Sequence, residues 1–157
     1  NAKGLNLNRE WLTPGMENSP EGFLVLNKMR ETGLDMHLDI HGDEAIPYNF
    51  VAGSEGIPGY DDHLKELEDS FKAALLTVTP EFQDEHGYPK DEPGQANLTV
   101  GSSAVAHEFN ALAYTVEMPF KDNDDLPDPD YGWSDRRSYQ FGQDTLAAIV
   151  NVVDKLR

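Results

Sequence analysis

The sequence contains no cysteine, which excludes a disulfide framework and any metal site built on thiolates. This absence fits a reducing compartment, so we expect a cytoplasmic location. Long apolar runs are also missing, and no stretch approaches the length of a membrane span. The opening residues lack the pattern of a signal peptide. Because the first residue is Asn1 rather than Met, we expect that the chain is processed or belongs to something longer.

Basic residues are scarce, with 12 Lys and Arg against 29 Asp and Glu and a net charge of −17. A surface of this kind repels nucleic acid and anionic membranes, so we expect neither as a partner. General solubility or salt tolerance is the favoured explanation of the acidity. The acidic run at residues 121–125 lacks the glycine and the distal glutamate of a calcium loop, and a solvated loop is expected there.

The 157 residues are enough for one domain with a substantial core, and 38% of them are hydrophobic. Periodicity and capping signals predict helices over residues 20–32, 61–77, 102–109 and 134–156. Strands are predicted over residues 34–40 and 112–118, with an irregular or edge strand at 44–51, where Pro47 interrupts the pattern. Residues 80–99 are expected to form a long irregular loop. This order predicts an α/β fold with a mixed, mostly parallel sheet flanked by helices.

His41 is the most informative single residue. The alternating strand of residues 36–40 delivers it to the strand end, where Gly42 is expected to turn the backbone, and Asp43 and Glu44 follow. Such a position is where α/β folds place metal ligands and catalytic groups. The alternative is a histidine that closes a turn through a hydrogen bond to backbone.

Three other segments carry chemical content. Asn8 and Arg9 combine amide donors with a guanidinium fork, which suits a carboxylate, although an exposed Arg beside a turn Asn is the simpler explanation. Glu117 lies in an otherwise apolar strand, where a carboxylate is costly unless it is paired or poised for proton transfer. Its alternative is an edge-strand Glu that reaches solvent. Tyr88 belongs to a Tyr-Pro-Lys-Asp segment that could also be an ordinary turn.

Other histidines invite zinc assignments on weaker grounds. His63 shares the H-x-x-E spacing of His41, but its charged neighbours predict a solvated helix face. Glu44 could reach the same metal as His41, but zinc needs at least three protein ligands in a catalytic site. His37 and Asp39 share a strand face with His41 and are candidates for its supporting shell or for the core.

Taken in order, N-L-N-R-E-W, D-I-H-G-D-E, Y-P-K-D and Y-T-V-E-M resemble the second half of a zinc metallocarboxypeptidase domain. The branch they resemble is that of the cytosolic carboxypeptidases and their bacterial relatives. The resemblance covers nearly the whole chain, from about Gly4 to the final helix. It implies that this chain is the C-terminal portion of a larger catalytic domain, preceded by a small β-rich domain.

The resemblance also implies roles for matching positions. His41 would be the third zinc ligand, and Asn8 and Arg9 would hold the C-terminal carboxylate of a peptide. Glu117 would be the general base, and Tyr88 would close over the substrate. An Asn–Arg pair that binds a free terminal carboxylate makes the enzyme an exopeptidase.

Two departures from the family qualify that expectation. The first two zinc ligands and the oxyanion arginine of the family should lie upstream of Asn1, so the missing N-terminal half of the same domain is an expected partner. The family's G-x-G-R segment is Gly-Ser-Ser-Ala here, with Ala104 at the arginine position, which speaks against removal of terminal glutamate. His107, on the helix that follows, is a candidate for the pocket or a surface histidine.

Two other functions stay open on the sequence. One is an N-acyl-amino-acid deacylase of the aspartoacylase type, which has a similar fold and zinc ligation. The other is an inactive module that binds C-terminal tails, although the intact Glu117 argues against it.

Overall fold

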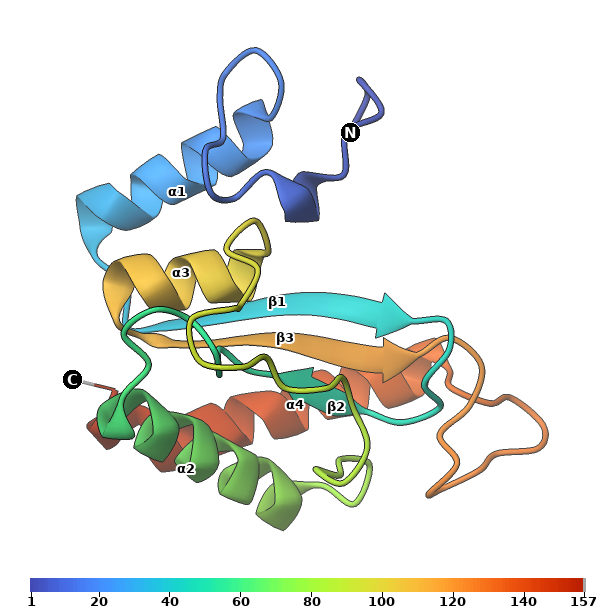
Figure 1. The fold of residues 1–157 in the computed structure, drawn as a ribbon. Coiled ribbons are helices and arrows are strands. Elements are labelled where there is room, and N and C mark those ends of the chain that lie inside the picture. Colours follow the sequence, from blue (N-terminus) through green and yellow to red (C-terminus); the bar gives the residue numbers. More distant parts are fainter. Residues whose placement is uncertain (157) are drawn as a thin grey trace.

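A three-stranded mixed sheet with helices on both faces forms the centre of the computed structural model, which describes residues 1–156 (Figure 1). The strands are β1 (Met36–Asp43), β2 (Phe50–Ala52) and β3 (Leu112–Pro119). The α-helices are α1 (Pro20–Thr32), α2 (Asp62–Val78), α3 (Gly101–Phe109) and α4 (Asp135–Val152), with short 3-10 helices η1 (Leu7–Arg9) and η2 (Val153–Lys155). No helix in residues 1–156 is both long and apolar enough to cross a membrane.

The strand order is β1-β3-β2, so β3 is the central strand. It pairs parallel with β1, which places His41 opposite Glu117, and antiparallel with β2, which places Ala52 opposite Thr115. The predicted mixed, mostly parallel α/β sheet is therefore confirmed.

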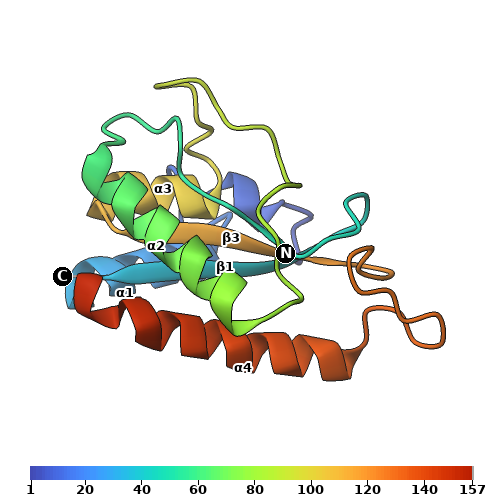
Figure 2. The ribbon, with the colours of Figure 1, turned by 90° about the horizontal axis from the view of Figure 1, so that it is seen from below.

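Helices cover the two faces of the sheet unequally (Figures 1 and 2). On one face α3 packs directly on β1 and β3, and α1 lies outside α3, tied to it by the pairing of Arg30 with Glu108 at 2.5 and 2.8 Å. On the other face α2 and α4 pack against each other and cover β3. The core there contains Phe71, Leu75 and Phe141, each worth about 1.5–3 kcal/mol when fully buried.

Local capping signals place most helix starts correctly. The Asp61 carboxylate accepts the Leu64 amide at 3.0 Å, and the Ser134 hydroxyl accepts the Arg137 amide at 3.4 Å. Ser19 does precede α1, but its hydroxyl accepts the Gly15 amide at 3.1 Å and does not cap the helix.

The expected turn at Gly42 is wrong. The strand β1 continues through Gly42 to Asp43, and the turn follows there, where the Asp43 carboxylate accepts the amides of Ala45 and Ile46 at 2.7 and 2.6 Å. Glycine is required at position 42 because the Phe120 ring packs directly against the backbone there. A Cβ at this position would lie 2.6 Å from the ring. Both His41 and Asp43 are therefore strand residues, and their side chains point to the same face of β1.

Two irregular segments join these elements. Residues 80–100 lack helix or strand apart from an isolated bridge between Asn49 and Phe82, as expected for the long loop. The acidic segment after β3 differs from the predicted solvated loop, because Asn123 is fully buried and donates to the carboxylate and the carbonyl of Glu81.

Candidate active site

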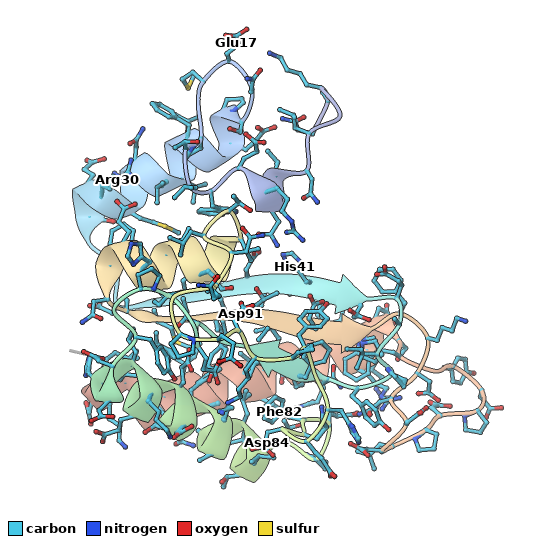
Figure 3. The ribbon with its side chains drawn as sticks, viewed as in Figure 1. Glu17, Arg30, His41, Phe82, Asp84 and Asp91 are labelled. Atoms are coloured by element: carbon cyan, nitrogen blue, oxygen red, sulfur yellow. The ribbon has the colours of Figure 1, made fainter. Side chains whose placement is uncertain are left out.

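A cavity of about 830 Å³ lies at the carboxyl ends of the parallel strands. Its walls come from η1, the end of β1, β2 and the turn after it, residues 82–91, the start of α3, and β3. The labelled Asp84 and Asp91 in Figure 3 mark the loop, and His41 stands on β1. A volume of this size accommodates an amino-acid residue and its flanking backbone.

His41 and Glu117 meet within this cavity because they are register partners on adjacent strands. The His41 Nδ1 atom lies 3.9 Å from the Glu117 Oε1 atom, and His41 Nε2 lies 3.0 Å from Asp39 Oδ2. The carboxylate of Asp39 thus orients the ring and leaves Nδ1 toward Glu117, which is how metal-binding histidines are commonly held.

Glu117 is buried, with 4% of its surface exposed. Burial raises its pKa, although the Tyr88 hydroxyl and the His41 ring act in the opposite direction. Because β3 is the central strand, the alternative of an edge-strand glutamate that reaches solvent is wrong. Glu117 Oε2 has no hydrogen-bond partner in the described chain, so the carboxyl group retains capacity for another proton donor.

Tyr88 reaches the same carboxyl group from the long loop. Its hydroxyl donates to Asp43 Oδ2 at 2.5 Å and contacts Glu117 Oε1 at 3.1 Å. Its ring packs edge-on against Phe50 at 4.9 Å between centroids. Burial first, and then the two carboxylates, raise the pKa of Tyr88, so the phenol stays protonated and acts as a donor.

Asp43 is a site residue to which the sequence assigned no role. It lies two residues beyond His41 on the same strand face, and strand alternation alone would have placed it beside the site. The hydrogen bonds that it accepts from Tyr88, Ile46 and Ala45 outweigh burial and lower its pKa. Asp43 is therefore an ionised acceptor that holds both its own turn and the tyrosine of the loop.

Asn8 and Arg9 lie in η1 and line the same cavity. The Asn6 side chain caps this short helix by accepting the Asn8 amide at 3.0 Å. Asn8 Oδ1 accepts the Gly101 amide at 2.8 Å, so the amide group has its two N–H donors left for a ligand. The Arg9 guanidinium donates to the Asn8 carbonyl at 2.6 Å and has no carboxylate partner within residues 1–156.

His86 also lines the cavity and stacks on the Tyr48 ring at 4.3 Å between centroids, whereas the other three histidines lie apart from this arrangement. His63 is exposed on α2, as predicted, and His107 Nδ1 is bound to the Pro58 carbonyl at 2.9 Å and does not line the cavity. His37 packs against the Trp11 ring at 5.8 Å, and burial lowers its pKa. Of the two residues that share the His41 face, Asp39 is the one that contacts its ring.

Residues 1–156 contain no group of three or more His, Cys, Asp or Glu side chains arranged to hold a metal ion. His41 fits one zinc ligand, because Nε2 is fixed by Asp39 while Nδ1 faces the cavity beside an acidic group. A catalytic zinc site needs three protein ligands and an open position. The described residues therefore match part of such a site and require further ligands from other residues.

The α/β sheet thus brings an imidazole and a buried carboxyl group together in a cavity that a guanidinium group also lines, an arrangement of the kind found in hydrolase active sites. No protein-family model matches the chain. A Pseudomonas aeruginosa metallo-carboxypeptidase structure is 50% identical over all of this chain, with a TM-score of 0.98, and a Burkholderia cenocepacia metallo-carboxypeptidase is 45% identical over 98% of it, with a TM-score of 0.94. An uncharacterised protein from Zymomonas mobilis is 49% identical over 99% of the chain.

The chain spans about two fifths of the length of these relatives: 42%, 40% and 41% respectively. Its fold is thus that of part of a metallo-carboxypeptidase. The two solved relatives are named metallo-carboxypeptidases.

Proposed function

We propose that this chain is the C-terminal portion of a zinc metallocarboxypeptidase catalytic domain of the cytosolic branch. The complete domain would remove the C-terminal residue of peptides or proteins, in the cytoplasm. The observation that carries this proposal is the distance of 3.9 Å between His41 and Glu117 inside a cavity that Arg9 also lines. An N-terminal half of the same domain would supply the other metal ligands.

Each residue then has a chemical task. Zinc, when bound with His41 as one ligand, would lower the pKa of water and polarise the scissile carbonyl. Glu117 takes a proton from the attacking water and delivers it to the leaving amine. Its raised pKa suits this exchange better than that of an ordinary exposed glutamate.

The terminal carboxylate of the substrate would be held by Asn8 and Arg9. Asn8 supplies amide N–H donors, and Arg9 supplies a guanidinium group with no carboxylate partner in residues 1–156, which can bind a carboxylate through two parallel hydrogen bonds. The Pseudomonas aeruginosa relative was solved with (2-guanidinoethylmercapto)succinic acid, a compound that carries carboxyl groups.

Tyr88 would cover the bound substrate from the loop of residues 80–100. Its hydroxyl is held between Asp43 and Glu117, next to the place where the proton is transferred. A loop that closes in this way excludes water from the reacting bond.

The proposal is tested with the complete protein, loaded with zinc, on a peptide with a free C-terminus and on the same peptide with an amidated C-terminus. We expect release of the terminal amino acid from the free peptide only. Release of an amino acid from N-acyl amino acids but not from peptides would indicate a deacylase instead. Peptide binding without turnover would indicate a tail-binding module.

A further inference from the structure

Burial does not hold the part of the long loop that carries Tyr88. Residues 84–95 are all exposed to solvent, and Tyr88 itself is 46% exposed. The start of the loop is fixed by the buried Phe82 and by Gln83, whose Nε2 donates to the Asn49 carbonyl at 3.1 Å. A segment with few buried apolar contacts opens easily, so the part beyond Gln83 needs specific contacts to keep one position over the cavity.

The turn between β2 and α2 provides these contacts. It comprises residues 53–60, and we call it the 53–60 turn. A Cβ on Gly56 would lie 2.6 Å from Asp91 Cβ and 3.0 Å from the carbonyl oxygens of Asp91 and Glu92, so the loop backbone packs directly on this glycine. The Gly56 φ angle of 92° is also one that other residues rarely adopt. The Ala96 amide donates to the Gly56 carbonyl at 3.0 Å and joins the two segments at a second point.

An ion pair adds a third contact, two residues from Tyr88 in the chain. Lys90 Nζ lies 2.6 Å from Glu55 Oε1. The hydrogen bond to Glu55 raises the pKa of Lys90, so the ammonium group stays charged. Both side chains line the cavity, and the pair therefore joins the loop to the 53–60 turn at the cavity wall. The position of Tyr88 is thus coupled to that of the turn.

Glu68 on α2 holds the 53–60 turn in place. Its carboxyl group accepts the amide and the hydroxyl of Ser54, at 2.7 and 2.8 Å, and the Tyr60 hydroxyl at 2.8 Å. One side chain therefore binds both ends of the turn. Glu68 is 1% exposed and does not line the cavity. A carboxyl group is costly to bury unless hydrogen bonds satisfy it, and here the donors are those of the turn.

We infer that Glu68 is a positioning residue, which places Tyr88 over the candidate active site by fixing the 53–60 turn. This rests on the proposed function, because the covering role of Tyr88 belongs to that proposal. Glu68 attaches the turn to α2, and the turn holds residues 90–96 through Glu55 and Gly56. The imidazole and the carboxyl group of the active site lie on β1 and β3, outside this series of contacts. Loosening the turn should therefore free the loop without moving them.

The first experiment measures the mobility of the loop without turnover, by hydrogen exchange of the amides of residues 90–96 in the complete, zinc-loaded protein. Glu55→Gln and Lys90→Met should each speed this exchange about threefold. Because the two side chains act as a pair, the double variant should add nothing to the larger single effect. Glu31→Gln is the control, since it removes a carboxylate that pairs with Lys28 at 2.9 Å on α1. Additive effects, or equal acceleration by Glu31→Gln, would overturn the inference.

The second experiment weakens the attachment to Glu68 itself. Tyr60→Phe removes one donor to the carboxyl group and leaves the buried Glu68 side chain in place. Loss of this hydrogen bond should speed exchange of residues 90–96 about threefold. Tyr139→Phe is the matched control, because Tyr139 is 74% exposed on α4, and it should leave the exchange unchanged. No acceleration in Tyr60→Phe would contradict the positioning role.

Kinetics on a peptide with a free C-terminus then shows whether the effect acts through Tyr88. Tyr60→Phe should lower kcat/KM about threefold, chiefly through a higher KM, but less than about 1.5-fold in a Tyr88→Phe background. An equal loss in both backgrounds would mean that Tyr60 and Glu68 support only the overall structure, and the inference would fail. Faster exchange in a protein that hydrolyses no peptide would support the attachment of the loop by Glu68 and reject the proposed function.

Discussion

Tyr88 and Asp43 are 45 residues apart in the chain and share a hydrogen bond of 2.5 Å at the candidate active site. The phenol has one proton to donate, and the distances assign it chiefly to Asp43, since Glu117 Oε1 is farther away at 3.1 Å. The other Asp43 oxygen is occupied by two backbone amides of the turn after β1. Asp43 therefore fixes the loop of residues 80–100 to the end of β1.

The first prediction follows from this bond. Asp43→Asn keeps an oxygen for the turn amides but replaces the acceptor that faces Tyr88 with an amide N–H group. Loss of a hydrogen bond to a charged acceptor costs about 1.5–3 kcal/mol, so the loop should open more than tenfold more often. Hydrogen exchange of the amides in residues 83–91 measures this change. In a Tyr88→Phe background the same substitution should add almost nothing, and an additive effect would show that Asp43 acts only through its turn.

The second prediction concerns Glu117 as the proposed general base. Glu117→Gln preserves the shape of the side chain but cannot accept a proton, so kcat of the complete enzyme should fall by about 10²–10⁴-fold. Substrate affinity should change little, because the residues proposed to hold the terminal carboxylate are Asn8 and Arg9. Steady-state kinetics on a free C-terminal peptide separates the two effects. Retention of more than a tenth of the activity would show that another group is the base.

The third prediction is that the 157-residue chain by itself binds zinc weakly and hydrolyses little. Its described residues include one imidazole placed to act as a zinc ligand, that of His41, and no cluster of three possible ligands. Metal titration followed by calorimetry checks this expectation, with the complete protein as the positive control. Stoichiometric zinc binding by the chain alone with micromolar affinity or better would contradict it.

The fourth prediction concerns Arg137 on α4, which stabilises the acidic segment after β3. Its guanidinium donates to both Glu81 oxygens at 2.9 and 2.6 Å and to Asp122 at 2.9 Å, and it stacks over Trp133 at 4.8 Å. Removal of one partner from such a partly buried network typically costs about 2–4 kcal/mol. Arg137→Met should therefore lower the free energy of unfolding by this amount, as chemical denaturation would show. A change below about 0.5 kcal/mol would mean that these interactions of Arg137 contribute nothing measurable to the free energy of unfolding.

The pH dependence of stability gives a fifth prediction at the same place. Burial opposes ionisation of Asp122, but hydrogen bonds from the amides of Asn123 and Asp128 and from Arg137 outweigh it and lower its pKa from 3.8. A lowered pKa stabilises the fold above the unfolded value of 3.8 and loses that stabilisation as the pH falls through the folded value. The thermal midpoint should thus decrease below about pH 4, and Arg137→Met should flatten this slope. An unchanged slope in the variant would exclude Arg137 as a cause.

Several features of the fold were predictable from local patterns. The alternation of residues 112–118 and the apolar stripe of α2 predicted elements that the structure contains, and Asp61 and Ser134 cap their helices through short-range hydrogen bonds. These signals involve residues within a few positions of each other, so they can be recognised from the sequence without knowledge of the fold. The turn expected at Gly42 was wrong because glycine is needed there to make room for the Phe120 ring. The position of that ring depends on how the chain folds after β3.

The sequence by itself identified the candidate side chains, which are His41 and Glu117 at strand positions of known face and Asn8 and Arg9 on an early loop. Only the tertiary structure decided that β3 is the central strand, which buries Glu117 and opposes it to His41. It also decided that Asp43 meets Tyr88. These relationships depend on strand register and on the path of long loops. Both are set by the packing of the whole core, which no local pattern encodes.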